Sequence, residues 1–448
     1  MNADVGTIDR KALEAILNRT PPACELAVAV VDESSRTTRL AESVIQANVS
    51  VRDLTVWLEL RRDTRSTLVT LHSLEPEPVR AAIGQALRIL DTLGDGDPLI
   101  PLEPTKPVPR IDMFDRKTDA WSPKQAAKAL QEAVRIADIG RLSVAGALTL
   151  TSTARGIAHT GGMMLTASRT EVDLSLTCAD PSGASGWDRA YGHRIGDIDI
   201  AAVAKRAASR AIRSRDPVEL EPGPYTVVLE PGAVGPMLLF LSFLSFGGSP
   251  FNRGTSFMAG HVGEKVLPDF MTIRDDPLDP RMGGWPFDFE GTPCAPVTLI
   301  ENGVARSVVH DRTTAGQAGC ASTGHALAPG NGFGPYPKCM VMSPGETSTD
   351  ALIAGIDQGL LITRFWYINY VNPMKTMITG TTRDGTFRIE NGKVTGAIRN
   401  MRFVESILEA FRRATAVSSE REYFRMFGST MRIPSMVIPA FTFTEVAS

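Results

Sequence analysis

Alternating apolar and polar residues predict strands in the first half of the chain. Residues 26–31 form a continuous apolar, strand-like run. Leucine or valine occupies every second position from Leu54 to Leu60, and the same period of two recurs from Val172 to Leu176. Because successive side chains of a strand point to opposite faces, each alternating stretch is predicted to bury one face.

Helical spacing and capping signals predict four helices among these strands. The first spans residues 9–17, and the second, residues 78–93, has a proline in its first turn and an apolar stripe along one face. The third begins after Ser122, which is followed by proline at the first helical position and glutamine at the third, the pattern of a capping box. The fourth begins near Asp199.

The second half of the chain is rich in glycine and in strand-like segments. Glu-Asn-Gly occurs at residues 301–303 and again at residues 390–392, each time between two apolar runs. Asn-Gly tolerates the positive φ angles of a type I′ turn, so both sites are predicted to be β-hairpins. Helices are predicted at residues 349–358 and 403–413, whereas residues 322–346 are irregular and fit either a functional covering loop or a mobile one.

Two proline-rich segments divide the sequence into three units. They are residues 98–109 (PLIPLEPTKPVP) and residues 216–224 (DPVELEPGP). The domains predicted from them are residues 1–105, 110–216 and 222–448. Helices and strands do not alternate in regular βαβ order, which favours an α+β fold: mixed N-terminal and central units followed by a large β-rich C-terminal domain.

Composition and charge exclude several classes of protein. The 448 residues carry a formal net charge of -3, which gives no electrostatic reason to expect nucleic acid or an anionic membrane as a partner. The apolar run 237–246 is about half as long as a membrane span and is predicted to be a buried helix or strand. Five scattered cysteines and the absence of a basic and apolar leader in residues 1–5 lead us to expect a reducing, cytoplasmic setting.

Residue types that could carry chemistry are present, but none forms a complete catalytic pattern. No two histidines are four residues apart and no HExxH motif occurs, so we expect no metal centre made by this chain alone. Asp288 and Glu290 could act as general acid and base, but bonding to backbone amides in turns is the favoured interpretation. Residues 369–375 place amides next to an aromatic triplet, which fits a peptide-binding cleft and an ordinary strand with a turn equally well.

Several short motifs follow one another in the second half of the chain. They are Phe-Asn-Arg-Gly at 251–254, Gly-Glu-Lys-Val at 263–266, Asp-Asp at 275–276, Asp-Phe-Glu-Gly-Thr-Pro at 288–293, Ser-Thr-Gly-His-Ala at 322–326 and Ile-Glu-Asn-Gly-Lys at 389–393. In this order, across about residues 222–440, they resemble the C-terminal region of the TldD/PmbA family of two-subunit metalloproteases. At 322–326 this chain has histidine where the family pattern has asparagine.

The resemblance places the family's zinc-binding motif, His-Glu-x-x-x-His, on the apolar run. The first histidine corresponds to Phe240, the glutamate to Leu241 and the second histidine to Ser245. No cysteine follows Cys339, so the cysteine that completes the family's zinc site has no counterpart either.

The resemblance therefore implies a TldE/PmbA-like subunit that has no catalytic residues and binds no cofactor itself. Zinc is expected on an HExxxH-bearing, TldD-like partner in a heterodimer that cleaves unfolded or modified peptides or small amides. We expect neither nucleic acid nor membrane as a partner. The candidate residues of a substrate cleft, within or near residues 322–346 and 369–375, are Arg253, His261, His325, Asn369, Asn372 and Lys375.

Two other functions remain open from the sequence. The chain could be an independent, metal-free hydrolase that uses Cys294, Cys339 or His261. It could also be a homodimeric binding protein without enzymatic activity.

Overall fold

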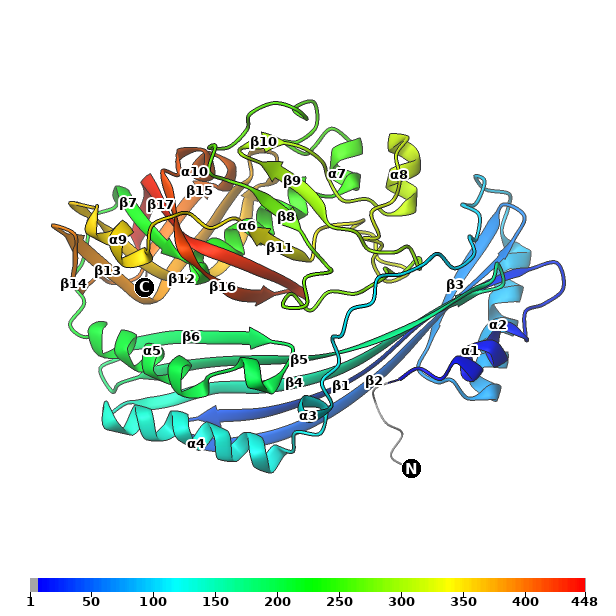
Figure 1. The fold of residues 1–448 in the computed structure, drawn as a ribbon, viewed down its shortest axis with the longest axis horizontal. Coiled ribbons are helices and arrows are strands. Elements are labelled where there is room, and N and C mark those ends of the chain that lie inside the picture. Colours follow the sequence, from blue (N-terminus) through cyan, green and yellow to red (C-terminus); the bar gives the residue numbers. More distant parts are fainter. Residues whose placement is uncertain (1–6, 448) are drawn as a thin grey trace.

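Two β-sheets organise the protein in the computed structural model, which describes residues 7–447 (Figure 1). Residues 1–5, in which the sequence predicts no basic and apolar leader, lie outside the described part. A sheet of long strands comes first, and a larger β-rich sheet is built from the C-terminal half. This mixture of helices and sheets confirms the predicted α+β class.

The first sheet has six antiparallel strands in the order β3-β2-β1-β4-β5-β6. Their bounds are β1 (Glu25–Ala41), β2 (Val44–Arg62), β3 (Arg65–Leu71), β4 (Ser143–His159), β5 (Met163–Ala179) and β6 (Ser185–Gly192). The central contact joins β1 to β4, with partners running from Ala27 opposite His159 to Leu40 opposite Gly146. Strands from residues 25–71 and from residues 143–192 therefore share one sheet.

Helices cover one face of this sheet, and the C-terminal half lies against the other (Figure 1). The helical elements are α1 (Arg10–Leu17), α2 (Pro76–Thr92), α3 (Arg116–Asp119), α4 (Pro123–Ile139), the 3-10 turn η1 (Ile195–Asp197) and α5 (Ile200–Arg213). Along β4, Ala154 and Ala158 pack in the core beneath α1 and α2, whereas Ile157 packs against Phe287 of the C-terminal half. The predicted starts of α4 and α5 are confirmed, because Ser122 forms the predicted capping box and Asp199 caps α5 by accepting from Ala202 N.

The proline-rich segment after α2 runs along the edge of β5 without forming a helix or strand. Thr105 Oγ1 accepts a hydrogen bond from the backbone N of Met164 at 3.1 Å, and Met113 O accepts one from Thr170 N at 2.9 Å. The segment thus supplies partners to backbone groups at an edge that β6 leaves uncovered.

The C-terminal sheet has eleven strands. Their bounds are β7 (Gly223–Glu230), β8 (Ile273–Asp275), β9 (Val297–Glu301), β10 (Val304–Ala305), β11 (Cys339–Met342), β12 (Gln358–Asn372), β13 (Met377–Glu390), β14 (Lys393–Ala397), β15 (Met401–Ser406), β16 (Ala416–Met426) and β17 (Ser429–Val446). Strand β7 pairs with both β12 and β17, so β7, β12, β13, β15 and β17 form a closed ring. The helical elements are α6 (Pro231–Ser245), α7 (Gly248–Asn252), α8 (Arg312–Ala318), α9 (Thr349–Ala354), η2 (Pro373–Lys375) and α10 (Ile407–Arg413).

Both predicted Asn-Gly hairpins are confirmed. Asn302 and Gly303 have φ angles of 48° and 76°, and Asn391 and Gly392 have φ angles of 49° and 73°. The first hairpin is shorter than predicted, because β10 ends at Ala305.

Two predicted helices differ from the structure. Helix α9 ends at Ala354 with Gly355 as its C-cap, and β12 begins at Gln358, so the prediction of a helix over residues 349–358 was too long. Residues 401–406 form strand β15 between β13 and β17, and only residues 407–413 are helical. In that second case, the pairing of β15 with two strands overrides the local helical pattern.

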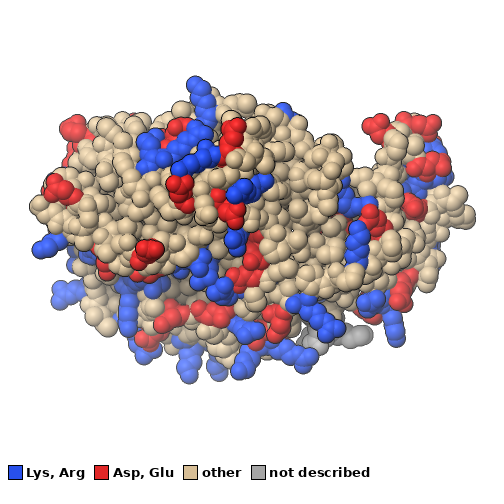
Figure 2. Space-filling model, turned by 45° about the horizontal axis from the view of Figure 1, so that its top comes forward, with Lys and Arg blue, Asp and Glu red and all other residues tan. Residues whose placement is uncertain are grey.

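Charged side chains of both signs are interspersed over the face shown in Figure 2. No helix within residues 7–447 combines the length and the apolar character that crossing a membrane requires.

Candidate functional site

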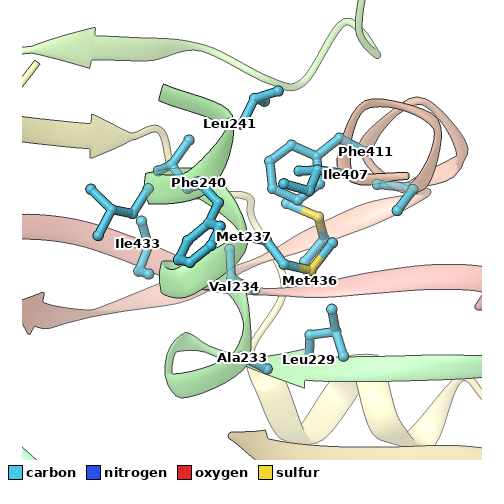
Figure 3. Close-up of a cluster of buried hydrophobic side chains, with 14 of the residues drawn as sticks. Leu229, Ala233, Val234, Met237, Phe240, Leu241, Ile407, Phe411, Ile433 and Met436 are labelled. Atoms are coloured by element: carbon cyan, nitrogen blue, oxygen red, sulfur yellow. The ribbon is translucent and has the colours of Figure 1, made fainter. Parts of the chain in front are cut away.

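Helix α6 carries the three positions on which the sequence resemblance led us to expect a zinc motif, and it lies in the C-terminal core. Phe240, Leu241 and Ser245 are 8%, 0% and 1% exposed. Figure 3 shows α6 among apolar side chains from β7, α10 and β17, including Phe411 and Met436. The predicted buried element of residues 237–246 is therefore a core helix.

The side chains at these positions do not fit a zinc ion. Phenylalanine and leucine have no lone pair to donate, and a neutral serine hydroxyl is a poor ligand compared with histidine or cysteine. Within residues 7–447, no group of three or more His, Cys, Asp or Glu side chains is arranged to hold a metal ion.

An aromatic cluster packs beside α6 on the side of Phe240. The Phe240 and Tyr370 rings lie 4.9 Å apart between centroids, and the Tyr370 hydroxyl donates a 2.7 Å hydrogen bond to Phe240 O. Phe243 contacts Tyr336 edge to face at 4.9 Å and Phe333 at 6.0 Å. Phe240 is thus contacted by a ring from β12, and Phe243 of the same helix is contacted by rings from the irregular segment 322–346.

A cleft of about 760 Å³ lies between the first sheet and the C-terminal half. Its wall includes Trp57, Arg61 and His159 from the sheet, Glu290 and Arg312 from the C-terminal half, and loop residues 326–331. Burial and the neighbouring Asp288 raise the pKa of Glu290 to about 7, although Glu290 Oε2 accepts a 2.9 Å bond from Arg312 N. Glu290 can therefore exchange a proton near neutral pH.

A second cavity of about 280 Å³ adjoins this cleft and shares Phe289 and Ala326 with it. His325, a predicted cleft residue, lines this cavity, and its Nε2 lies 2.7 Å from Asp275 Oδ2. Both side chains of this pair are buried. The structure thus brings His325 to a cavity, within the irregular segment that the sequence singled out.

Asp288 follows the favoured interpretation from the sequence, in which it bonds backbone amides in a turn. Its Oδ1 accepts from the backbone N of Glu290 and Thr292, and its Oδ2 accepts from Ala326 N, each at 2.9 Å. Burial nevertheless raises the pKa of Asp288 to about 6. The side chain fixes the turn that forms part of the cavity wall.

The other predicted cleft residues lie away from both cavities. Arg253 is exposed, and the exposed His261 bonds Glu264 Oε2 at 2.7 Å through Nδ1. Asn369 and Lys375 are exposed near the end of β12, and Asn372 caps the turn η2. The sequence grouped these residues with His325, but the structure does not bring them together.

Cys294 and Cys339 line the smaller cavity, yet their environment opposes nucleophilic chemistry. Burial raises the pKa of both thiols above the usual range, and the neighbouring Asp288 and Asp275 add to this effect for Cys294 and Cys339 respectively. Because the thiolate is the reactive form, both thiols are suppressed as nucleophiles.

Sequence reasoning missed the cationic wall of the smaller cavity. Arg155 comes from β4, Arg169 from β5 and Lys338 from the residue before β11. Each of these cations is a single charged residue within a strand or loop sequence, so no local motif identifies it as part of a site. The one available signal was arginine at positions of β4 and β5 that face the C-terminal half.

The chain matches one family over most of its length. Residues 222–445 match the PmbA/TldA metallopeptidase C-terminal domain, and residues 115–215 match the PmbA/TldA metallopeptidase central domain. A metalloprotease of Methanothermobacter thermautotrophicus is 25% identical over 261 residues, covering 56% of each chain. A metalloprotease TldD homolog of Buchnera aphidicola is 26% identical over 230 residues, covering 50% of this chain and 47% of the relative. The chain spans about half the length of these curated relatives.

The fold is also similar to a solved structure over nearly its whole length. TldE from Thermococcus kodakarensis superposes with a TM-score of 0.87 at 21% identity, covering 97% of this chain and 100% of that one. At this identity the likeness concerns the fold alone.

Proposed function

Since the chain belongs to the PmbA/TldD metallopeptidase family, we propose that it is a TldE/PmbA-like, non-catalytic subunit of a heterodimeric zinc metallopeptidase or amidase. In this proposal, an HExxxH-bearing, TldD-like homologue supplies the zinc site. The chain described here supplies cleft surface for an unfolded or modified peptide, or for a small amide. Its five free cysteines fit a cytoplasmic setting.

The observation that carries the proposal is the apolar filling of helix α6. A helix that held zinc would direct its ligands into a space that water and substrate can enter. In α6, Leu241 is fully buried and Phe240 packs against Tyr370. The chain has the family fold, but the helix on which the zinc motif is expected is filled with apolar side chains. This combination supports a role in binding and assembly.

The cleft beside the first sheet supports binding of an extended ligand. Its volume of about 760 Å³ is within the range of sites for small molecules and short peptides. Trp57 and Leu68 offer apolar surface, while Arg61 and Glu290 offer charges of opposite sign. A peptide has both apolar side chains and polar backbone groups, so a wall of this mixed kind suits it.

An exposed apolar patch on β12 and η2 supports the proposed partnership. Trp366, Tyr367, Val371 and Met374 are 46%, 79%, 52% and 69% exposed. Tyr370, within the same stretch, contacts α6. Apolar side chains that gather on a surface mark interaction sites more often than scattered ones do. We propose that this patch contacts the zinc-bearing subunit, at a place adjoining the helix that has lost its ligands.

Co-expression with the HExxxH-bearing homologue from the same genome tests the proposal. The chain alone should contain no stoichiometric zinc and should not hydrolyse peptides or small amides. Together, the two chains should co-purify in a one-to-one ratio with one zinc per pair and show hydrolysis. The matched control is a pair in which the partner's motif glutamate is replaced by glutamine, which should assemble and remain inactive.

Three results would contradict the proposal. Hydrolysis by the isolated chain that a chelator stops would assign a metal site to this chain. Assembly only with itself, with the homologue present in equal amount, would favour a homodimeric binding protein. Metal-free activity that disappears on replacing Cys294, Cys339 or His261 by alanine would instead indicate an independent hydrolase.

A further inference from the structure

The 280 Å³ cavity has a wall with an unusual concentration of cationic side chains. Arg155, Arg169, Arg425 and Lys338 all line it. They come from both halves of the protein, because Arg155 and Arg169 lie on the first sheet, while Arg425 lies on β16 and Lys338 precedes β11. The cavity opens toward solvent beside the exposed Glu33 and Gly428.

Two of these cations, Arg169 and Arg425, share one carboxylate within the protein. Glu171 is 3% exposed and lies 3.0 Å from both Arg169 Nη2 and Arg425 Nη1. Although burial opposes it, the two guanidinium groups hold the pKa of Glu171 below its ordinary value. Glu171 is therefore a full negative charge between two positive ones.

The remaining two cations have no carboxylate partner among the described residues. Arg155 is 7% exposed and donates from Nη1 to Phe287 O at 3.1 Å, while its Nε has no hydrogen-bond partner. The Lys338 ammonium forms no ion pair, and the Tyr336 ring centroid lies 5.5 Å from its Nζ. Burial, together with Arg155 and Arg169, lowers the pKa of Lys338 to about 8. Arg155 is a buried cation and Lys338 is half-buried. Burying a cation without a carboxylate partner is costly, and a bound anion would reduce that cost.

The charge count indicates the kind of anion. Four cations meet three buried carboxylates: Glu171, Asp288, which accepts three backbone N–H groups, and Asp275, which is bonded to His325. The four cations thus exceed these three carboxylates by one positive charge. Glu33 at the mouth is exposed, so solvent screens its charge. One excess charge matches a single carboxylate better than a phosphate dianion.

Aromatic surface beside the cations suits the rest of such a ligand. The Arg155 guanidinium lies 4.1 Å from the Trp285 ring centroid and 4.0 Å from that of Phe289, and Arg169 lies 4.7 Å from Trp285. This stacking holds the guanidinium of Arg155 in one orientation. Trp285 and Met282 also line the cavity.

We propose that this cavity is a binding site for a small organic carboxylate, held by Lys338 and Arg155 with its apolar part against Trp285. The carboxylate can belong to a free metabolite or to the C-terminus of a short peptide. Neither source depends on the proposed partnership with a zinc-bearing subunit. The site is separate from helix α6 and lies between the two halves of this one chain.

The same arginines also join the two halves, so they are poor choices for a test. Arg155 bonds Phe287 O and Arg169 bonds Gly283 O, and loss of either would weaken the contact between the sheet and the C-terminal half. Lys338 makes no such bond, and Lys338→Met removes its charge while keeping a side chain of similar length. Lys393→Met, on the exposed β14 hairpin, is the matched control.

Calorimetric titration of the full chain tests the proposal with acetate, succinate, benzoate and a tripeptide ending in a free carboxylate. We expect saturable binding of at least one of these, weakened at least tenfold by Lys338→Met and unchanged by Lys393→Met. At pH 8, binding to the wild type should take up a fraction of a proton, because an anion beside Lys338 raises its pKa. Lys338→Met should abolish this uptake, which a structural role for Lys338 would not predict.

The ligands also distinguish the two sources of the carboxylate. Tighter binding of the tripeptide than of the small acids, lost when its C-terminus is amidated, would identify a peptide end. Tighter binding of succinate or benzoate would identify a free acid. The proposal is overturned if no carboxylate binds at millimolar concentration, if Lys338→Met binds as the wild type does, or if inorganic phosphate binds more tightly than every carboxylate.

Discussion

Replacing Leu241 by glutamate, the residue that the zinc motif would require, should destabilise the protein severely. The Leu241 side chain is fully buried in the core around α6. Removing its apolar surface from the interior costs about 2–3 kcal/mol. Burying a carboxyl group without a partner adds about 1–3 kcal/mol. The expected loss of about 3–6 kcal/mol compares with a total stability of about 5–15 kcal/mol for a typical domain.

Denaturant unfolding of Leu241→Glu, followed by circular dichroism, measures this loss. Leu241→Met is the matched control, since it keeps the volume and the apolar character and should cost under about 1.5 kcal/mol. The loss should also depend on pH. Burial raises the pKa of the new carboxyl group above its unfolded value, so the unfolded chain releases its proton first as pH rises. The difference from the wild type should therefore be larger at pH 8 than at pH 4.

The combined variant Phe240→His, Leu241→Glu and Ser245→His tests whether the apolar filling of α6 prevents the helix from holding zinc. If it unfolded at the same denaturant concentration as the wild type and bound one zinc ion, α6 would be a metal-ready helix and its apolar filling would have no bearing on function. We expect a poorly folded protein instead, because three polar groups would enter a core that offers them no partners.

Three further outcomes follow from the described contacts. Asp275→Asn should lower the free energy of unfolding by about 3–5 kcal/mol, because it breaks the buried contact with His325. Asp276→Asn, at a less buried position, should lower it by less, and equal losses in denaturant unfolding would contradict this prediction. The raised pKa of Glu290 makes the folded protein less stable as pH rises from about 4.5 to 7, so Glu290→Gln should flatten that decline in a pH series of thermal unfolding. Tyr367→Ser should reduce the amount of zinc-bearing subunit that co-purifies with the chain. Val51→Ser, on the exposed part of β2, should leave that amount unchanged, and equal effects of the two variants would place the interface elsewhere.

Local signals predicted the features that local chemistry determines. The Asn-Gly turns at residues 302–303 and 391–392 and the capping box at Ser122 depend only on neighbouring residues, and each forms as predicted. Residues 403–406 were wrongly predicted to be helical because their conformation depends on pairing with β13 and β17, which lie elsewhere in the sequence.

The candidate site was predictable only in part, and for the same reason. His325 could be selected because it lies in an irregular segment with a recognisable motif, and it does line a cavity. Arg155 and Lys338 meet across the contact between the sheet and the C-terminal half, although 183 positions separate them in the chain. No pattern within either segment reveals that meeting. A charged residue on the inward face of a strand is visible in a sequence only when the topology is known.

The pairing of β1 with β4 has a consequence for synthesis on the ribosome. Strand β1 ends at Ala41 and β4 begins at Ser143, so about a hundred residues must be translated before β1 gains its second neighbour. At about 5–20 residues per second, that interval lasts on the order of 5–20 seconds. Throughout it, the nascent chain carries an open strand edge that a second nascent chain could join. The pairing of β1 with β4 can be completed only after the chain has passed residue 159, so this edge stays open through about the first third of translation.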